Sequence, residues 1–334
     1  MSSLFILPEN IVEKVYGGIV FQVVRLIFNL LSFIPFPLIY LEIAGILFLI
    51  WRLFKSTIPL KNKGIKMLIG IFAFILLFYV LWAFNYRRPS FSEKFPLQKV
   101  QMDSLAWFDE LNFSIAGLKR SRPTHLINYN SSQVEELIRP NIQRLCNEFG
   151  YLAIGKARVK SLWPKGILLR IKTAGFYLPY AGEAYIDKGL ISLQIPFTIG
   201  HEMCHGYGVT DEGACNLLSY LALFNHSDST VSYSAQMGYY RYVAGEFRYH
   251  YPDVYQEIRA ALPMEIQADL DNINANLMKY PDILPKVRDK IYNNYLNIQG
   301  IKEGMASYDN IIGYVRQYRL DGSLNDLLFK ARLN

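Results

Sequence analysis

Long apolar runs dominate the first 86 residues of this chain, whereas the rest mixes apolar and polar positions as a globular domain does. Met67 to Phe84 is 18 residues without a charge, and at 1.5 Å per residue it covers roughly 27 Å, close to the thickness of a bilayer's hydrocarbon core. Leu38 to Trp51 is interrupted only by Glu42. We therefore predict a membrane domain over residues 1–86, with two or three transmembrane helices at about 15–34, 35–54 and 67–84.

The first of these segments carries a stripe of polar residues. They follow one another at spacings of three and four, which places them on one face of a helix: Gln22, Arg25, Asn29 and Ser32. The stripe could face neighbouring helices in a three-helix bundle, or the helix could lie in the membrane interface with the stripe in water. A spanning helix is favoured because the other faces are almost wholly apolar. Prolines at 35 and 37 predict a break before the next segment.

Beyond residue 86 the pattern predicts a mainly α (α+β) domain. We expect residues 87–130 to be a linker that wraps onto this domain, and residues 131–334 to form the domain itself. We expect a helix with Ser131 or Ser132 as its N-cap and Gly150 as its C-terminal stop, with Pro140 kinking or splitting it. Short apolar runs then predict two strands of a small sheet, Ile167–Ile171 and Glu183–Ile186, paired through a turn at 179–182.

Charge and cysteine content narrow the classes of function. The net charge is +7, yet no basic run interleaved with aromatic residues suits a nucleic-acid groove, so we expect no nucleic-acid partner. Five basic residues instead gather between the second and third apolar segments, at positions 52, 55, 61, 63 and 66. This loop should be cytoplasmic, which puts the globular domain on the periplasmic side of the cytoplasmic membrane; Arg87 and Arg88 oppose this orientation but are outnumbered. Three cysteines without a repeated spacing argue against a disulfide framework.

The clearest chemical signal is a His-Glu-x-x-His motif in the run "PFTIGHEMCHGYGVTDEGACN". Pro196 suits a helix's first turn, and glycines at 206 and 208 should end that helix. His201 and His205 then lie one turn apart on the same face and can both bind one zinc ion. Glu202 is close enough to act as general base, taking a proton from water and returning it to the leaving amine.

Two residues compete to be the third zinc ligand. Asp211 would complete a pattern like that of the metzincins, but no convincing Met-turn follows, Met237 being the one nearby candidate. Glu212 would point to the metal from the first turn of a second helix, as in the gluzincins, and is favoured. Asn216 lies one turn further on the same face, where it could orient a histidine or the ligand carboxylate. Three protein ligands leave a fourth position for water, as in catalytic zinc sites.

Several stretches in order along the chain resemble one family of bacterial membrane proteins. They are the three apolar segments with their basic loop, "NYRRP", "GFYLPYAGEA", the motif run to "NLLSYLA", "YRYV" and "YLNIQGIKEGMASY". That family is known only as a domain of unknown function and is regarded as zincin-like, so the resemblance implies a zincin-like fold without a substrate. Its members usually carry E-x-E-A-N after the second histidine. Glu212 and Asn216 match the first acid and the asparagine, whereas Ala214 stands where the second acid is expected.

Further residues could support catalysis. A hydrolase needs a donor for the oxyanion, and we single out Tyr242 and Tyr308 because the family resemblance includes their surroundings; other candidates are Tyr239, Tyr240, His226 and His250. An edge strand above the motif helix could bind an extended substrate by β-addition. Glu183 could then capture a free α-amine, although a surface charge is the simpler interpretation.

Two main functional hypotheses follow. The first is a membrane-anchored zinc metallopeptidase of gluzincin type that acts on a peptide or protein substrate of the cell envelope. The second is a non-catalytic scaffold or receptor domain, stabilised by zinc, that binds an envelope partner without turnover. A weaker third is hydrolysis of a non-peptide amide such as a cell-wall crosslink.

Overall fold

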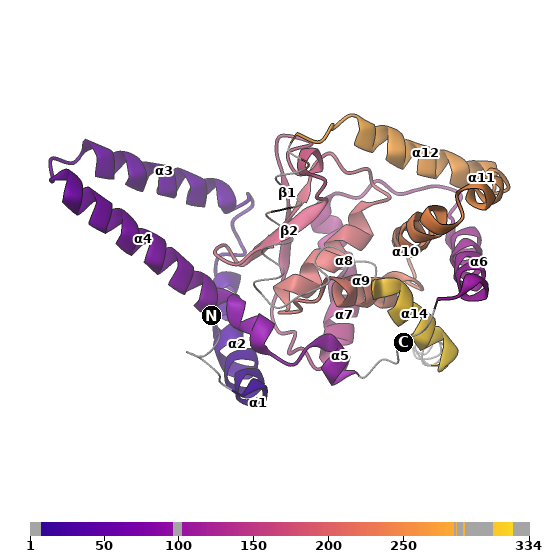
Figure 1. Cartoon of the computed structure of the whole chain (residues 1–334), viewed down its shortest axis with the longest axis horizontal. Coiled ribbons are helices and arrows are strands. Elements are labelled where there is room, and N and C mark those ends of the chain that lie inside the picture. The colour runs from indigo at the N-terminus through magenta and orange to yellow at the C-terminus, as the bar shows by residue number, and fades with distance from the viewer. Residues whose placement is uncertain (1–7, 96–101, 284, 286–289, 291–309, 323–334) are drawn as a thin grey trace.

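A computed structural model describes residues 8–95, 102–283, 285, 290 and 310–322. It is mainly helical with one small sheet, as the hydrophobic pattern predicted. Two apolar helices, α3 (Ile39–Lys55) and α4 (Leu60–Leu81), project together from the rest of the molecule (Figure 1). None of their residues is buried. Within the described residues, α4 is the one helix both long and apolar enough to cross a membrane.

The N-terminal apolar segment lies against the globular part. Three helical stretches, α1 (Glu9–Ile11), the π-helix η1 (Val12–Val20) and α2 (Phe21–Asn29), follow one another without a break. Residues 30–38 then form turns that contain Pro35 and Pro37, so the predicted break is confirmed. The polar stripe of this segment faces the globular domain, an arrangement that neither sequence-based alternative described.

The segment expected as a linker contributes to the core. It begins at the last residue of the 3₁₀ turn η2 (Ala83–Arg87) and contains two helices, α5 (Phe91–Lys94) and α6 (Ser104–Ser121). Leu111 and Leu118 of α6 are fully buried. The expectation of a linker is therefore wrong for α6. Its apolar positions are interspersed with acidic and basic residues, which weakened the helical signal.

α7 (Ser131–Glu148) and three strands lie between α6 and the motif helix. α7 begins one residue earlier than expected, with Asn130 as N-cap, and it continues through Pro140 without splitting. The sheet has the order β1-β3-β2, from β1 (Arg158–Leu162), β2 (Gly175–Leu178) and β3 (Glu183–Asp187). β3 pairs in parallel with β1 and antiparallel with β2, with Leu178 opposite Glu183.

One of the two predicted strands is present in the structure and the other is not. β3 and the turn before it are confirmed, but the first predicted strand, 167–171, is wrong because these residues form turns that include the 3₁₀ helix η3 (Leu169–Ile171). Three backbone N–H groups there, of residues 166, 168 and 169, donate to the buried carboxylate of Asp187 at 2.7, 2.7 and 3.1 Å. This hydrogen bonding replaces a strand ladder.

Helices make up the rest. α8 (Ile195–Gly206) and α9 (Glu212–Leu223) lie at the centre of the fold, and every residue of α9 is buried. Around them lie α10 (Ser229–His250), α11 (Pro252–Ala260), α12 (Met264–Met278) and α14 (Asn310–Leu320). One large apolar core joins α6, α7, α8, α9 and α10, so the motif helix is held on several sides.

Candidate metal centre

α8 carries the motif as predicted, with proline in its first turn and its end at Gly206. The 3.6-residue period puts His201 and His205 on one face, and their ring centroids lie 4.9 Å apart. α9 packs closely against α8 because Gly200 has no side chain: a Cβ there would lie 2.4 Å from the Ser219 hydroxyl oxygen. This close approach brings the first turn of α9 to the two imidazoles.

Glu212, not Asp211, joins the two histidines. These three are the group within the described residues whose side chains could hold a metal ion, and all are buried. Asp211 is instead the N-cap of α9, where its carboxylate accepts a hydrogen bond of 2.6 Å from the Ala214 N–H. Asp211 is therefore engaged at the helix start, and the structure favours Glu212 among the alternatives that the sequence left open.

The three ligand atoms form a nearly equilateral triangle. His201 Nε2 lies 3.2 Å from His205 Nε2 and 3.1 Å from Glu212 Oε2, and the third side, from His205 Nε2 to Glu212 Oε2, is 3.2 Å. Ligand atoms held tetrahedrally around zinc at about 2.0–2.1 Å lie about 3.3–3.4 Å apart. The cluster therefore fits such an ion after movements of a few tenths of an ångström.

Hydrogen bonds on the far side of each imidazole turn its Nε2 lone pair toward the cluster. His205 Nδ1 lies 2.9 Å from the Val209 carbonyl oxygen, which can only accept, so Nδ1 carries the proton. His201 Nδ1 lies 2.7 Å from Asn216 Oδ1, the position in which Asn216 would orient that ring. Two imidazole nitrogens and a carboxylate oxygen thus converge on one point, an arrangement that suits a metal cation or, without one, a shared proton.

Glu202 lies beside the cluster, beneath the sheet. It is 4% exposed, and its Oε2 is buried with no hydrogen-bond partner among the described residues. β2 approaches it closely at Gly175, where a Cβ would lie 2.7 Å from Glu202 Oε1 and 2.6 Å from the Tyr185 carbonyl oxygen. A buried carboxylate oxygen without a partner fits an acceptor for a bound water molecule.

Burial and mutual charge set the electrostatics of the site. Burial raises the pKa of Glu202 to about 7, although the two histidines oppose this. Burial alone would lower the pKa of His205, but the Glu212 carboxylate outweighs it and raises that pKa to about 9. Burial would likewise raise the pKa of Glu212, yet the imidazoles outweigh burial and lower it. The cluster therefore attracts positive charge.

The cysteines near the motif are not part of the triangle. All three cysteines are buried and free. The Cys215 sulfur lies 3.4 Å from His205 Nδ1, the nitrogen on the far side of that ring from the cluster. Cys215 therefore packs behind a ligand.

The structure does not place the other predicted residues in the cluster. Tyr242, on α10, is half-buried with its ring 6.5 Å from that of Phe197, at the start of α8. Tyr308 lies outside the described residues. Of the further candidates, Tyr239 donates to Glu110, Tyr240 is buried in the core, His226 accepts from the Asp228 N–H, and His250 packs on Trp107.

Glu183 is fully engaged elsewhere. Its carboxylate forms a buried ion pair with Lys160 and accepts hydrogen bonds from the Leu38 N–H at 3.1 Å and the Tyr185 hydroxyl at 2.9 Å. The Ile39 N–H in turn donates to the Tyr185 hydroxyl. Glu183 therefore fixes the start of α3 to the sheet, and this geometry gives no support to capture of an α-amine.

Two aromatic residues that the sequence did not single out, Trp82 and Tyr177, lie close to the cluster. Trp82, at the end of α4, lies with its ring 6.3 Å from that of His205 and 4.8 Å from that of Tyr177 on β2. Burial raises the pKa of Tyr177 to about 12, so its hydroxyl stays protonated and can donate. The alternation of "GFYL" could have indicated Tyr177, because residues 175 and 177 share a face of a strand.

Comparison with known proteins places the chain in one family. No curated protein and no solved structure matches it. A family model does match, over residues 13–315, a range that includes α2, the projecting helices α3 and α4, the sheet and the candidate metal centre. The chain therefore belongs to the family described as "Protein of unknown function (DUF3810)".

Proposed function

We propose that this protein is a membrane-anchored zinc metallopeptidase of gluzincin type. The observation that carries the proposal is the triangle of two imidazole nitrogens and one carboxylate oxygen. Beside it lies Glu202, whose buried Oε2 has no hydrogen-bond partner in the part of the chain that the structure describes. Three protein ligands would hold zinc and leave a position open, which is the arrangement of catalytic sites. The zincin-like fold, with its small sheet over the motif helix, belongs to the same proposal.

The chain's own residues have defined roles in this mechanism. Zinc, when bound by His201, His205 and Glu212, would supply Lewis-acid activation of water and of the substrate carbonyl. Glu202 accepts a proton from the attacking water and delivers it to the leaving nitrogen. Asn216 fixes the orientation of the His201 ring. Candidates for the donor to the oxyanion are Tyr242, Tyr308 and Tyr177, whose pKa is affected by the charge of His205.

Substitution of Glu202 by glutamine tests the proposal. The change keeps size and shape but removes the base, so Glu202→Gln should bind zinc in the wild-type amount and lose at least about 100-fold of the peptide hydrolysis. Zinc content by mass spectrometry and cleavage of a fluorogenic peptide library measure both. Glu136→Gln, an exposed glutamate on α7, is the matched control and should keep full activity. Wild-type hydrolysis by Glu202→Gln would contradict the mechanism.

The same variant addresses the scaffold hypothesis. The metal ligands are at most 9% exposed, as expected of a zinc ion that only stabilises a fold. If the protein is such a scaffold, a strain carrying Glu202→Gln should behave as wild type, whereas loss of zinc ligands should remove the protein's function. Peptide or protein substrates of the envelope are expected for the enzyme, since the proposed location is the periplasmic side of the cytoplasmic membrane.

A further inference from the structure

The N-terminal helical segment, residues 9–34, presents an unusual outer face. Every exposed residue from Val15 to Phe36 is apolar, glycine or proline. The large exposed side chains recur at helical spacing: Val15, Ile19, Val23, Leu26, Leu30 and Phe33, which are between 50% and 79% exposed. They form one continuous stripe. Water alone is a poor environment for an apolar stripe of this length.

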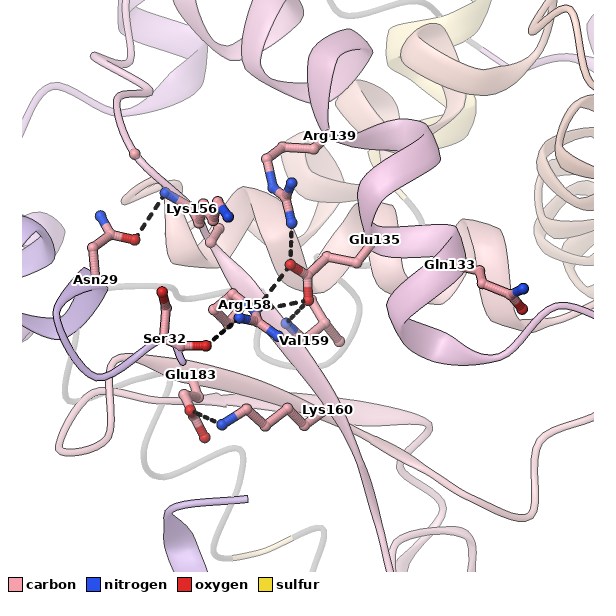
Figure 2. A network of polar contacts seen from close by, with 12 residues as sticks. Asn29, Ser32, Gln133, Glu135, Arg139, Lys156, Arg158, Val159, Lys160 and Glu183 are labelled. Atoms are coloured by element: carbon pink, nitrogen blue, oxygen red, sulfur yellow. Dashed lines mark hydrogen bonds and ion pairs between the residues drawn. The ribbon is translucent and has the colours of Figure 1, made fainter. Parts of the chain in front are cut away.

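The opposite, polar face of the same segment is bound to the globular domain. Arg25 donates to the carbonyl oxygens of Leu152, at 3.2 Å, and of Ile154. Asn29 accepts from the Lys156 N–H at 2.9 Å, and the Ser32 carbonyl oxygen accepts from Arg158. Figure 2 shows these last two contacts, next to the ion pairs that Arg158 and Arg139 make with the buried Glu135.

The binding extends to the beginning of the segment. Glu13 accepts from Arg88 at 2.6 Å and from Lys94 at 2.9 Å. Gly17 lets the Arg88 side chain lie directly against the helix, since a Cβ there would be 2.7 Å from Arg88 Nε. Contacts therefore run from residue 13 to residue 32, which is roughly 28 Å of helix and turn. A helix fixed along its whole length to a polar domain cannot cross a bilayer without taking that domain with it.

We propose that residues 9–34 lie in the plane of the membrane interface, with the polar face on the domain and the apolar stripe in the lipid. The bilayer is the occupant because the stripe is continuous with the helices that leave the same part of the domain: residues 35–38 lead directly into the unburied apolar helix α3. In Figure 1, α1 and α2 extend away from the base of α4, and they do not run alongside the projecting pair. The dimensions suit an interfacial amphipathic helix.

This placement sets the metal centre against the membrane surface. Phe21 of α2 packs with Trp82 at a ring distance of 6.1 Å, and Trp82 contacts the ring of His205. One layer of aromatic side chains thus separates the interfacial helix from a metal ligand. The interfacial placement of residues 9–34 does not depend on peptidase activity, so either proposal can be wrong while the other holds.

Depth measurements on the full chain test the placement. Single cysteines at Ile19, Val23, Leu26 and Leu30 would carry nitroxide labels in protein reconstituted into vesicles of phosphatidylethanolamine and phosphatidylglycerol. The three native cysteines are buried and do not compete for the label. Labels at Phe72, on α4, and at Arg248, on α10, supply the deep and the aqueous reference. Circular dichroism confirms that each variant is folded.

All four labels should have a similar shallow depth, about 5–10 Å into the headgroup and acyl boundary. A helix that spans would instead give depths that change steadily with position, by about 16 Å between positions 19 and 30. That gradient would overturn the proposal. So would water-like accessibility at all four sites, or shielding from both lipid and water, which would mean that a protein surface covers the stripe.

Discussion

The two histidines of the centre are held by different kinds of group. The ring of His205 is fixed by the backbone carbonyl of Val209, which no side-chain substitution removes. The ring of His201 is fixed by the side chain of Asn216, one turn along α9 from Glu212. α9 therefore supplies both a metal ligand and the residue that orients another ligand, so substitutions on this helix separate the two contributions.

We predict a graded loss of zinc across three variants of this region. Glu212→Ala removes a ligand and should abolish stoichiometric zinc, while Asn216→Ala should weaken zinc affinity by about 10–100-fold because the His201 ring is no longer oriented. Asp211→Ala should keep zinc and lose about 1 kcal/mol of unfolding free energy, since it removes a helix N-cap. Competition titration with a chelator measures affinity. Loss of zinc in Asp211→Ala together with retention in Glu212→Ala would reverse the assignment.

Local spacing explains which site residues could be predicted. His201, Glu202, His205 and Asn216 lie on two short helices, where an interval of one turn determines the shared face. Glu183 shows the limit of such reasoning, because its partner Lys160 lies on another strand and its other contact comes from the start of α3. Long-range contacts of this kind leave no trace in the local pattern.

β2 approaches the proposed base, Glu202, directly at Gly175. Its residues alternate between two faces: Phe176 and Leu178 pack on the small cluster around Tyr185, while Gly175 and Tyr177 face α8 and the end of α4. The strand lies so close that only glycine fits at position 175. Its distance from α8 therefore governs the position of Glu202.

Gly175→Ala should disturb this contact. The added methyl group overlaps Glu202 and the Tyr185 carbonyl oxygen, so we expect a loss of about 1–3 kcal/mol in unfolding free energy, as for other overpacked sites, and a fall in hydrolysis. Gly245→Ala is the control: this exposed α10 residue has open space around it, and alanine there should stabilise the helix by about 0.5–1 kcal/mol. Chemical denaturation and peptide cleavage give both readouts. Equal behaviour of the two variants would show that the β2 contact is unimportant.

The elements that could be predicted are those with a strong pattern and local ends. The break at Pro35 and Pro37, the motif helix and the turn before β3 follow from short-range chemistry. β1 was not predicted because "RVKSL" has only two apolar residues, three positions apart. Its charged residues find partners elsewhere in the fold: Lys160 pairs with Glu183 and Arg158 with Glu135. Residues 167–171 were mistaken for a strand because the carboxylate of Asp187, which organises their turns, lies in a distant part of the sequence.

At the scale of the whole molecule, both ends of the projecting pair are fixed to the globular domain. α3 starts at the carboxylate of Glu183, and α4 ends where Trp82 packs on Tyr177. The turn between the two helices lies far from the domain (Figure 1), and the basic residues at positions 52, 55, 61 and 63 flank it. If the pair crosses a bilayer, the domain and this basic turn must lie on opposite sides, and the positive charges assign the turn to the cytoplasm.

The proposed interfacial placement of residues 9–34 predicts the side of the membrane on which Asn10 lies. An interfacial N-terminal helix leaves Asn10 on the side of the domain, whereas a third spanning helix would put it with the basic turn. Cysteines introduced at the exposed positions Asn10, Thr57 and Arg248 therefore distinguish two spans from three. In intact cells with a permeable outer membrane, an impermeant maleimide should label positions 10 and 248 and should reach position 57 only after the cytoplasmic membrane is broken. Labelling of position 248 alone in intact cells would require the first helix to span, and labelling of position 57 alone would place the metal centre in the cytoplasm.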